Sequence, residues 1–209
     1  MLACLDLEGV LVPEIWIAFA EKTGINELCL TTRDVPDYDK LMRGRLKILD
    51  EHNLKLADIQ EVIRGIRPLD GAPEFLDWLR SEFQVLILSD TFYEFAAPLM
   101  AQLGFPTLFC NFLVVDSNGR IIDYRLRQKD GKTKAVAALK NLNFPVIASG
   151  DSYNDTGMLK EADAGIFFRP PENIIKEFPQ FGVTRTYDEL RTAFLDLRKT
   201  IIKEKSQEH

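Results

Sequence analysis

Short apolar runs recur along this chain, and each leads into polar residues. Continuous apolar runs of this kind are typical of strands buried on both faces of a parallel sheet. The segments between the runs carry apolar residues at helical spacing, as Val136, Leu139 and Leu142 do. This alternation predicts an α/β fold with a doubly wound, Rossmann-like parallel sheet. The runs are Leu2–Leu5, Val85–Leu88, Val146–Ala148 and Gly165–Phe168.

A long segment without strand character separates the first two runs. The chain has 209 residues, enough for one domain or for one domain that carries an insertion. We expect a small helical cap domain at residues 13–67, inserted into a core domain of residues 1–12 and 68–209. The patches of helical periodicity within the insertion are Ile15–Lys22, Tyr38–His52 and Leu56–Gly65.

A turn signal between two further apolar runs predicts a β-hairpin. Asn118-Gly119 lies between the runs Phe112–Val115 and Arg120–Leu126. Asn-Gly favours tight hairpin turns because both residues tolerate positive φ. A hairpin pairs its strands antiparallel, so we place this one at the edge of the parallel sheet.

The charge balance narrows the possible partners. Lys and Arg total 26 against 32 Asp and Glu, a formal net charge of −6, and no long basic run offsets it. We therefore expect a small-molecule substrate and neither a nucleic acid nor a membrane as partner. No apolar stretch approaches the roughly 18 residues that span a bilayer. We expect a cytoplasmic protein, either a monomer or a homodimer.

The cysteines and histidines exclude several kinds of catalytic centre. Three scattered cysteines suit neither a disulfide framework nor a thiolate metal site, and we expect them to be packing residues. The two histidines, His52 and the terminal His209, cannot form a histidine zinc centre, and a Ser-His-Asp triad would depend on His52 alone. Nucleophilic and acid–base chemistry should therefore fall to carboxylates. The cysteines are Cys4, Cys29 and Cys110.

Two groups of acidic residues follow predicted strands. Asp6 and Glu8 lie two residues apart, so in extended backbone both project to the same side, and one could attack while the other handles protons. Alone, this pair also fits a turn or a solvated sheet edge. Residues 150–155, Gly-Asp-Ser-Tyr-Asn-Asp, offer the hard oxygen ligands that magnesium prefers. A helix cap is the alternative, but capping uses one oxygen and leaves the others unassigned.

Ser89 and Lys132 are candidate phosphate-binding residues. The Ser89 hydroxyl could donate to a phosphate oxygen, and Lys132 could neutralise phosphate charge. Gly131-Lys132-Thr133 does not form a P-loop, because Leu126 stands where that motif requires its first glycine. No G-x-G-x-x-G follows the first run, so a dinucleotide site is not supported.

Together and in this order, these pieces resemble the haloacid dehalogenase superfamily of phosphatases and phosphotransferases. The pieces are Asp6-Leu-Glu-Gly-Val10, Ser89, Lys132 and residues 150–155. The resemblance covers nearly the whole chain, and residues 13–67 match the family's helical cap. The chain looks most similar to the phosphoserine phosphatase branch, close to bifunctional members that also pass phosphate from phosphoserine to homoserine. The resemblance thus implies a magnesium-dependent enzyme of amino-acid biosynthesis.

The resemblance implies catalytic and metal-binding roles for the matching residues. Asp6 would be the nucleophile that becomes an aspartyl phosphate, and Glu8 would be the general acid/base. Asp151 would coordinate magnesium together with Asp6 and the backbone carbonyl of Glu8. Asp155 would support the metal and the lysine.

The resemblance also implies substrate-binding residues. On the cap, Glu14 would bind the substrate ammonium and Arg45 its carboxylate, although each also fits a solvated helix face. Lys129 and Lys134 are alternatives for the lysine role. The expected phosphate-binding residues are Ser89, Asp90, Lys132 and Asn154.

The chain departs from the family pattern at two places. The usual first motif, Asp-x-Asp-x-Thr, has Glu8 and Val10 at its later positions here. The branch's usual Ser-Gly-Gly is Ser89-Asp90-Thr91. A glutamate reaches about one methylene further than an aspartate, so the proton donor must sit differently, and transfer to an alcohol could then compete with hydrolysis.

Three alternatives share parts of this pattern. A haloacid dehalogenase phosphatase for another small phosphomonoester would use the same residues. A signalling receiver domain is also doubly wound, but its phosphoacceptor aspartate lies on the third strand and it has no cap. A non-catalytic binding module would keep the fold without turnover. Fold analogy alone is weak support for the receiver domain. Magnesium-dependent turnover of a phosphomonoester separates the binding module from an enzyme.

Overall fold

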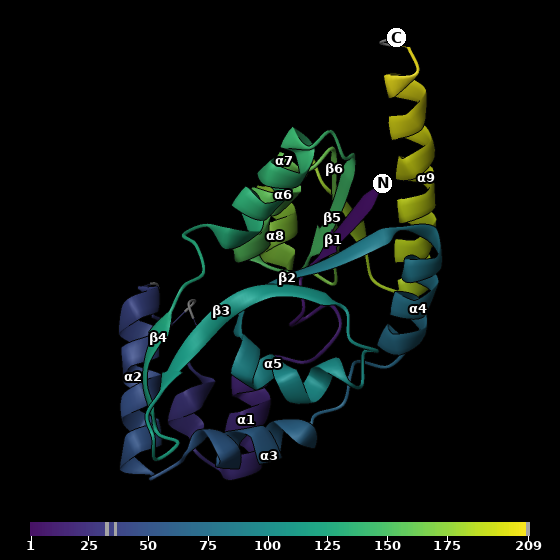
Figure 1. Ribbon diagram of the computed structural model, residues 1–209. Coiled ribbons are helices and arrows are strands. Elements are labelled where there is room, and N and C mark those ends of the chain that lie inside the picture. Colours follow the sequence, from purple (N-terminus) through teal and green to yellow (C-terminus); the bar gives the residue numbers. More distant parts are fainter. Residues whose placement is uncertain (32–33, 36, 208–209) are drawn as a thin grey trace.

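A seven-stranded sheet forms the centre of this computed structural model, which describes residues 1–31, 34, 35 and 37–207 (Figure 1). The strand order is β4-β3-β2-β1-β5-β6-β7, and neighbours are parallel except for the antiparallel pair β3 and β4. The strands are β1 Leu2–Leu5, β2 Gln84–Phe92, β3 Thr107–Val115, β4 Ile121–Arg125, β5 Val146–Gly150, β6 Ala164–Phe168 and β7 Gly182–Thr184.

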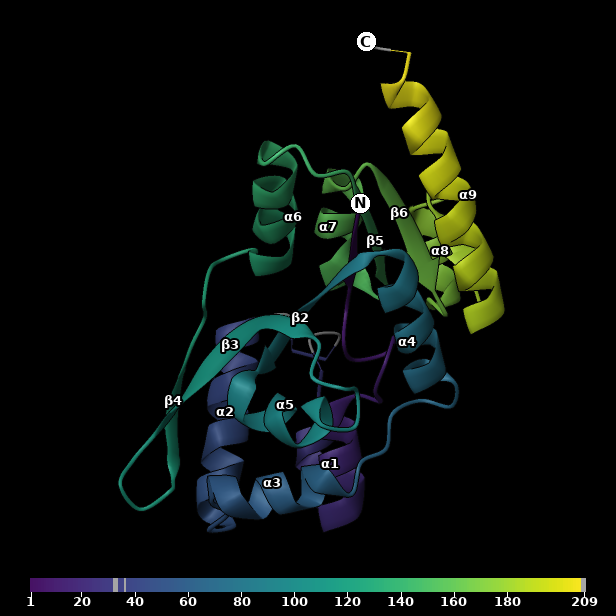
Figure 2. The same ribbon diagram turned by 45° about the vertical axis from the view of Figure 1, so that its right-hand side comes forward.

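Helices cover both faces of the sheet and one of its ends. Helices α4 and α9 pack on one face, and α6 and α7 pack on the other (Figure 2). The α-helices are α1 Ile15–Thr23, α2 Tyr38–Glu51, α3 Leu56–Arg64, α4 Ala72–Glu82, α5 Tyr93–Met100, α6 Gly131–Asn141, α7 Thr156–Glu161, α8 Glu172–Glu177 and α9 Tyr187–Lys205. Two short 3-10 helices, η1 Asn26–Cys29 and η2 Tyr153–Asp155, complete the described elements.

Strand β1 explains why the sheet needs two covering layers. Its side chains alternate, so Ala3 and Leu5 join the cluster beneath α4 and α9, whereas Leu2 and Cys4 join the cluster beneath α6 and α7. All four residues are buried. A strand buried on both faces carries apolar side chains throughout, and this explains the unbroken apolar run. The predicted doubly wound parallel sheet is confirmed.

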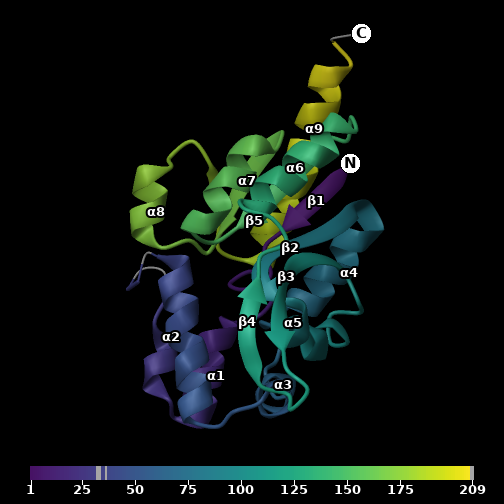
Figure 3. The same cartoon turned by 60° about the vertical axis from the view of Figure 1, so that its left-hand side comes forward.

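The predicted edge hairpin is also confirmed. Strands β3 and β4 pair antiparallel, and β4 lies at the edge of the sheet. The hairpin extends beside α2, where Arg43 Nη1 lies 2.9 Å from Asp123 Oδ1 and the Tyr124 hydroxyl donates to Asp39 Oδ1 at 2.7 Å (Figure 3). These contacts hold the hairpin against α2. Helices α1, α2 and α3 together form the helical segment that follows β1.

The sequence prediction missed parts of the sheet. Strand β2 does not stop at Leu88 but continues to Phe92, with an irregular pairing to β3 between these two residues. Polar Ser89-Asp90-Thr91 hid this extension because it breaks the apolar run. Strand β7 was not predicted either, since three residues with one apolar side chain carry almost no periodicity.

A tight loop follows β1 and places the first acidic residues. The backbone N–H groups of Leu11 and Val12 both donate to the Leu7 carbonyl, at 2.8 and 3.0 Å. The Tyr187 hydroxyl at the start of α9 donates to the Val10 carbonyl at 2.6 Å. Tyr187 is itself stacked on Phe168, with ring centroids 4.8 Å apart. The C-terminal helix thus anchors the loop that follows β1.

No helix among the described residues is both long enough and apolar enough to cross a membrane.

Replacing Tyr187 with Phe tests this anchor. The substitution keeps the stacked ring and removes the hydroxyl, leaving the buried Val10 carbonyl without its donor. We expect the free energy of unfolding to fall by about 1 to 2 kcal/mol, measured by chemical denaturation. Tyr153→Phe is the matched control, because the Tyr153 hydroxyl bonds Glu177 at the exposed surface. Equal losses in the two variants would contradict an anchoring role for Tyr187.

Candidate active site

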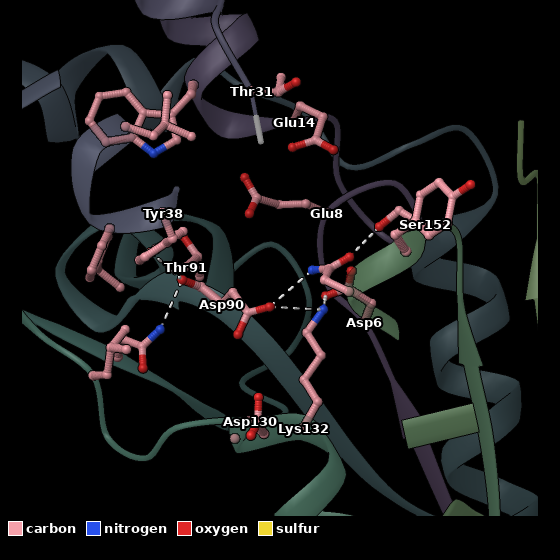
Figure 4. A pocket seen from close by; sticks show the side chains of 18 of the residues that line it. Asp6, Glu8, Glu14, Thr31, Tyr38, Asp90, Thr91, Asp130, Lys132 and Ser152 are labelled. Atoms are coloured by element: carbon pink, nitrogen blue, oxygen red, sulfur yellow. Dashed lines mark hydrogen bonds and ion pairs between the residues drawn. The ribbon is translucent and has the colours of Figure 1, made fainter. Parts of the chain in front are cut away.

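A cavity of about 740 Å³ opens at the carboxyl ends of β1, β2 and β5, between the sheet and the helical segment (Figure 4). Parallel sheets of this type bind their ligands at this end. Most residues that the sequence singled out line the cavity, whereas Ser89 and Asp155 are buried just behind its wall. The predicted site residues on the wall are Asp6, Glu8, Glu14, Arg45, Asp90, Lys132, Asp151 and Asn154.

Lys132 is the cation at the base of the cavity. Its ammonium lies 2.9 Å from Asp6 Oδ1, 2.7 Å from Asp155 Oδ1 and 3.7 Å from Asp90 Oδ2. Burial alone would lower the pKa of Lys132, but the carboxylates of Asp155 and Asp6 outweigh it and raise that pKa well above its ordinary value. Lys132 therefore stays charged.

Neither alternative lysine forms an ion pair with Asp6 or Asp155 among the described residues. Lys129 lines the cavity wall, and the exposed Lys134 does not. The ion pairs of Lys132 with the acidic cluster favour Lys132 for the expected lysine role.

Asp155 holds the end of β5 in place. Its carboxylate accepts from the backbone N–H groups of Asp151 at 2.9 Å and Ser152 at 3.1 Å, and from Lys132. This arrangement requires glycine at position 150, because a Cβ there would lie 2.3 Å from the Asp155 carboxyl carbon. The acidic segment thus includes a helix-cap interaction of Asp155, as the alternative interpretation proposed, and leaves Asp151 facing the cavity.

The acidic residues fit a divalent cation. Carboxylate oxygens of Asp6, Asp151 and Asp155 lie within 4.8 Å of one another. Burial and the neighbouring Asp155 raise the pKa of Asp151 to about 7, and they also raise the pKa of Asp6 well above its ordinary value. Three carboxylates beside one lysine therefore leave negative charge that a cation would offset. Hard carboxylate oxygens are the donors that such a cation prefers.

Glu8 lies across the cavity from Lys132 (Figure 4). Its Oε1 accepts from the backbone N–H of Ile15 at 2.7 Å, at the first residue of α1. Burial and the neighbouring Glu14 raise the pKa of Glu8 to about 8, against the lowering effect of the Ile15 hydrogen bond. Glu8 can therefore hold a proton near neutral pH, as a general acid must.

Arg45 on α2 contributes a cationic side chain to the cavity wall. It is only 8% exposed, its guanidinium lies 4.5 Å over the Trp16 ring, and its Nη2 donates to the Leu30 carbonyl at 2.7 Å. Among the described residues, Arg45 Nε has no hydrogen-bond partner. Burial lowers the pKa of Arg45 to about 10. A guanidinium that remains charged with a free donor is suited to bind an anion.

The end of β2 brings polar residues to the cavity and to the layer behind its wall. Ser89 is buried, and its Oγ accepts from the backbone N–H of Thr91 at 3.2 Å. Thr91, two residues further on the same strand, lines the cavity. Asn111 on β3 also reaches the wall, where its Nδ2 donates to the Asp90 carbonyl at 2.9 Å. The two-residue period of a strand could have indicated Thr91, whereas nothing in the sequence pattern indicated Asn111.

Sequence comparison shows which protein family and which known proteins this chain is similar to. The model of the haloacid dehalogenase-like hydrolases matches residues 1–163. A phosphoserine phosphatase of Pseudomonas syringae pv. tomato is 66% identical over 194 residues, 93% of this chain and 82% of that protein. Phosphoserine phosphatase ThrH of Pseudomonas aeruginosa is also 66% identical over 194 residues, 93% of this chain and 95% of that protein.

Solved structures share the same architecture. An apo form of phosphoserine phosphatase has a TM-score of 0.74 at 23% identity, covering 91% of this chain and 97% of that chain. A substrate-bound phosphoserine phosphatase complex has a TM-score of 0.73 at 20% identity, covering 92% of this chain and 97% of that chain. These likenesses show a common fold.

Replacing Gly150 with Ala tests the packing of the acidic cluster. The new methyl group would overlap the carboxyl of Asp155, which Lys132 and two backbone N–H groups hold in place. We expect overpacking to cost about 1 to 3 kcal/mol of unfolding free energy. We also expect turnover to fall, because Asp155 would be displaced from Lys132.

The matched control is Gly44→Ala on the exposed side of α2. A Cβ at Gly44 meets nothing within 4 Å. Alanine should therefore stabilise the helix by about 0.5 to 1 kcal/mol. Denaturation curves and turnover are measured on both variants. A Gly150→Ala protein as stable and as active as the Gly44→Ala protein would contradict the packing described.

Proposed function

The chain belongs to the haloacid dehalogenase-like hydrolases, and from that premise we propose that it is a magnesium-dependent phosphoserine phosphatase. The observation that carries the proposal is that Asp6, paired with the buried ammonium of Lys132, lines the same cavity as Arg45. A proposed nucleophile and a proposed anion-binding group thus line the same cavity. The names of the two Pseudomonas relatives supply the substrate.

Asp6 is the proposed nucleophile of two in-line displacements. In the first, an Asp6 oxygen bonds to phosphorus while the bond from phosphorus to the serine oxygen breaks, and Glu8 gives its proton to that oxygen. In the second, Glu8 removes a proton from water, whose oxygen bonds to phosphorus as the bond to Asp6 breaks. Free phosphate and an unmodified Asp6 result.

The residues around Asp6 would stabilise the transferring group. Lys132 supplies a fixed positive charge, and Asn154 and Ser89 supply neutral donors for phosphoryl oxygens. Asp6, Asp151 and the Glu8 backbone carbonyl would hold magnesium, with Asp155 in support. When bound, the metal neutralises negative charge on the phosphoryl oxygens. The protein's own residues mainly position the reacting groups and neutralise the charge of the phosphoryl oxygens.

The helical segment would select an amino acid. Arg45 would bind the substrate carboxylate, and Glu14 would bind the ammonium. The Nε of Arg45 has no hydrogen-bond partner within the described part of the chain. In this proposal residues 13–67 act as the cap domain and exclude bulk water during the reaction. A cytoplasmic location suits an enzyme that acts on free amino-acid phosphates.

Transfer to a second alcohol is part of the proposal. An alcohol can replace water in the second displacement if it lies where Glu8 can take its proton. Homoserine fits this position because it carries the amino and carboxyl groups that Glu14 and Arg45 would bind. The longer Glu8 at the position of the usual aspartate is the feature in this chain that supports transfer.

Asp6→Asn is the direct test of the nucleophile. The amide has nearly the same shape but cannot form the phosphoenzyme, so we expect phosphate release from phosphoserine to fall on the order of a thousandfold or more. Circular dichroism and thermal melting should show that the fold is kept. Activity within a few-fold of wild type would refute the assignment of Asp6.

The partition between water and alcohol is tested with one mixture. Protein, magnesium and phosphoserine are incubated with and without homoserine, and inorganic phosphate and phosphohomoserine are measured in the same sample. We expect phosphohomoserine to form at the expense of phosphate, and Glu8→Asp to shift the ratio toward phosphate. An unchanged ratio in Glu8→Asp would show that Glu8 does not set the partition.

A further inference from the structure

Asp90 is a carboxylate on the wall of a cavity that we propose binds phosphate. Its side chain is 46% exposed, whereas the side chains of Asp6 and Asp155 are 6% and 0% exposed. An ionised carboxylate only accepts hydrogen bonds, and its charge has the same sign as that of phosphate. The Asp90 side chain is therefore unsuited to the phosphate-binding role that the resemblance implies for this residue, and the phosphoryl-transfer steps above give it no other role.

The ion pairs of Lys132 show what Asp90 does to the ammonium. An ammonium group has three N–H donors. Two short contacts, at 2.9 and 2.7 Å, go to the buried carboxylates of Asp6 and Asp155. The contact to Asp90 is longer, at 3.7 Å, and lies on the side of Lys132 that faces the cavity (Figure 4). A phosphate beside Asp6 would need the same side of the ammonium.

Asp90 is held near Lys132 at both its side chain and its backbone. Asn154 Nδ2 donates to Asp90 Oδ2 at 3.0 Å. The Asp90 carbonyl accepts from Asn111 Nδ2 at 2.9 Å and from the Tyr38 hydroxyl at 3.5 Å. These contacts come from three other segments of the chain and limit how far the carboxylate can withdraw when an anion enters. A phosphate that enters beside Asp6 would therefore meet Asp90 as a like-charged competitor for Lys132.

We infer that Asp90 weakens the hold of the site on free phosphate and so limits product inhibition. This inference rests on the proposed function, because it concerns the phosphate that the reaction releases. The substrate meets the same repulsion, but it also has Arg45 and Glu14 to bind its amino-acid part. Free phosphate has only the groups around Asp6. Repulsion by Asp90 therefore shifts the balance toward product release.

The test compares two isosteric substitutions that each remove one negative charge from the cavity wall. Asp90→Asn removes the carboxylate beside Lys132. Asp130→Asn is the matched control, because Asp130 lines the same cavity but is not among the ion-pair partners of Lys132 in the described part of the chain. The inhibition constant for inorganic phosphate is measured during magnesium-dependent turnover of phosphoserine by wild type and both variants, and phosphate binding is measured by calorimetry.

We expect Asp90→Asn to bind inorganic phosphate about tenfold more tightly than wild type, as removing a like charge a few ångströms away predicts. Asp130→Asn should change the inhibition constant less than about twofold, because its charge is not beside Lys132. Raising the salt concentration should shrink the Asp90→Asn effect, since ions screen repulsion at a partly exposed group. A merely structural role for Asp90 would not produce tighter binding that depends on salt.

Failure of the role inferred for Asp90 can be told apart from failure of the proposed function. Unchanged or weaker phosphate binding in Asp90→Asn overturns the inference, and equal tightening in both variants assigns the effect to general cavity charge instead. If wild type turns over another phosphomonoester but not phosphoserine, the proposed substrate fails while the comparison of inhibition constants still decides the role of Asp90. If wild type neither turns over any phosphomonoester nor binds phosphate, the proposed function and the inference both fail.

Discussion

The ammonium of Lys132, buried among carboxylates, is the interaction on which the site depends. It pairs with Asp6 after β1 and with Asp155 after β5, so one side chain from α6 ties two loops together. Burying three charges is costly, and removing the lysine would leave two buried carboxylates without compensation, at a cost of several kcal/mol. The same charge balance places a nucleophile beside a fixed cation, so the contacts that hold these loops together also prepare them for phosphoryl chemistry.

Glu8 links the helical segment to the chemistry. Its carboxylate accepts from the N–H of Ile15, so the first turn of α1 sets the direction in which Glu8 points. The loop that carries Glu8 is anchored from behind by Tyr187 on α9. The position of the proposed proton donor is thus fixed by two helices that lie more than 150 residues apart in the chain, as the separation between residues 15 and 187 shows. The core and the helical segment share one apolar cluster, which keeps this geometry in place.

Much of this architecture could be predicted from the sequence because it follows from local patterns. The buried run Leu2–Leu5 and the turn at Asn118-Gly119 each indicate their own structure. The acidic residues follow predicted parallel strands, whose carboxyl ends meet at one end of the sheet. Contacts between distant segments could not be predicted in this way. Asn111 reaches Asp90 from the next strand, and the Arg45 guanidinium lies over Trp16 of another helix. Such pairings depend on tertiary packing, which no periodicity encodes.

If Asp6 accepts the phosphoryl group, the phosphoenzyme can be trapped with the phosphoryl group on Asp6. Protein with magnesium is mixed with phosphoserine labelled at phosphorus, quenched in acid within a single turnover, and digested so that the labelled peptide can be sequenced by mass spectrometry. We expect the label on the peptide that contains Asp6, on the Asp6 side chain, and none in Asp6→Asn. Label on another residue, or complete turnover with no labelled protein at any quench time, would show that Asp6 is not the phosphoryl acceptor.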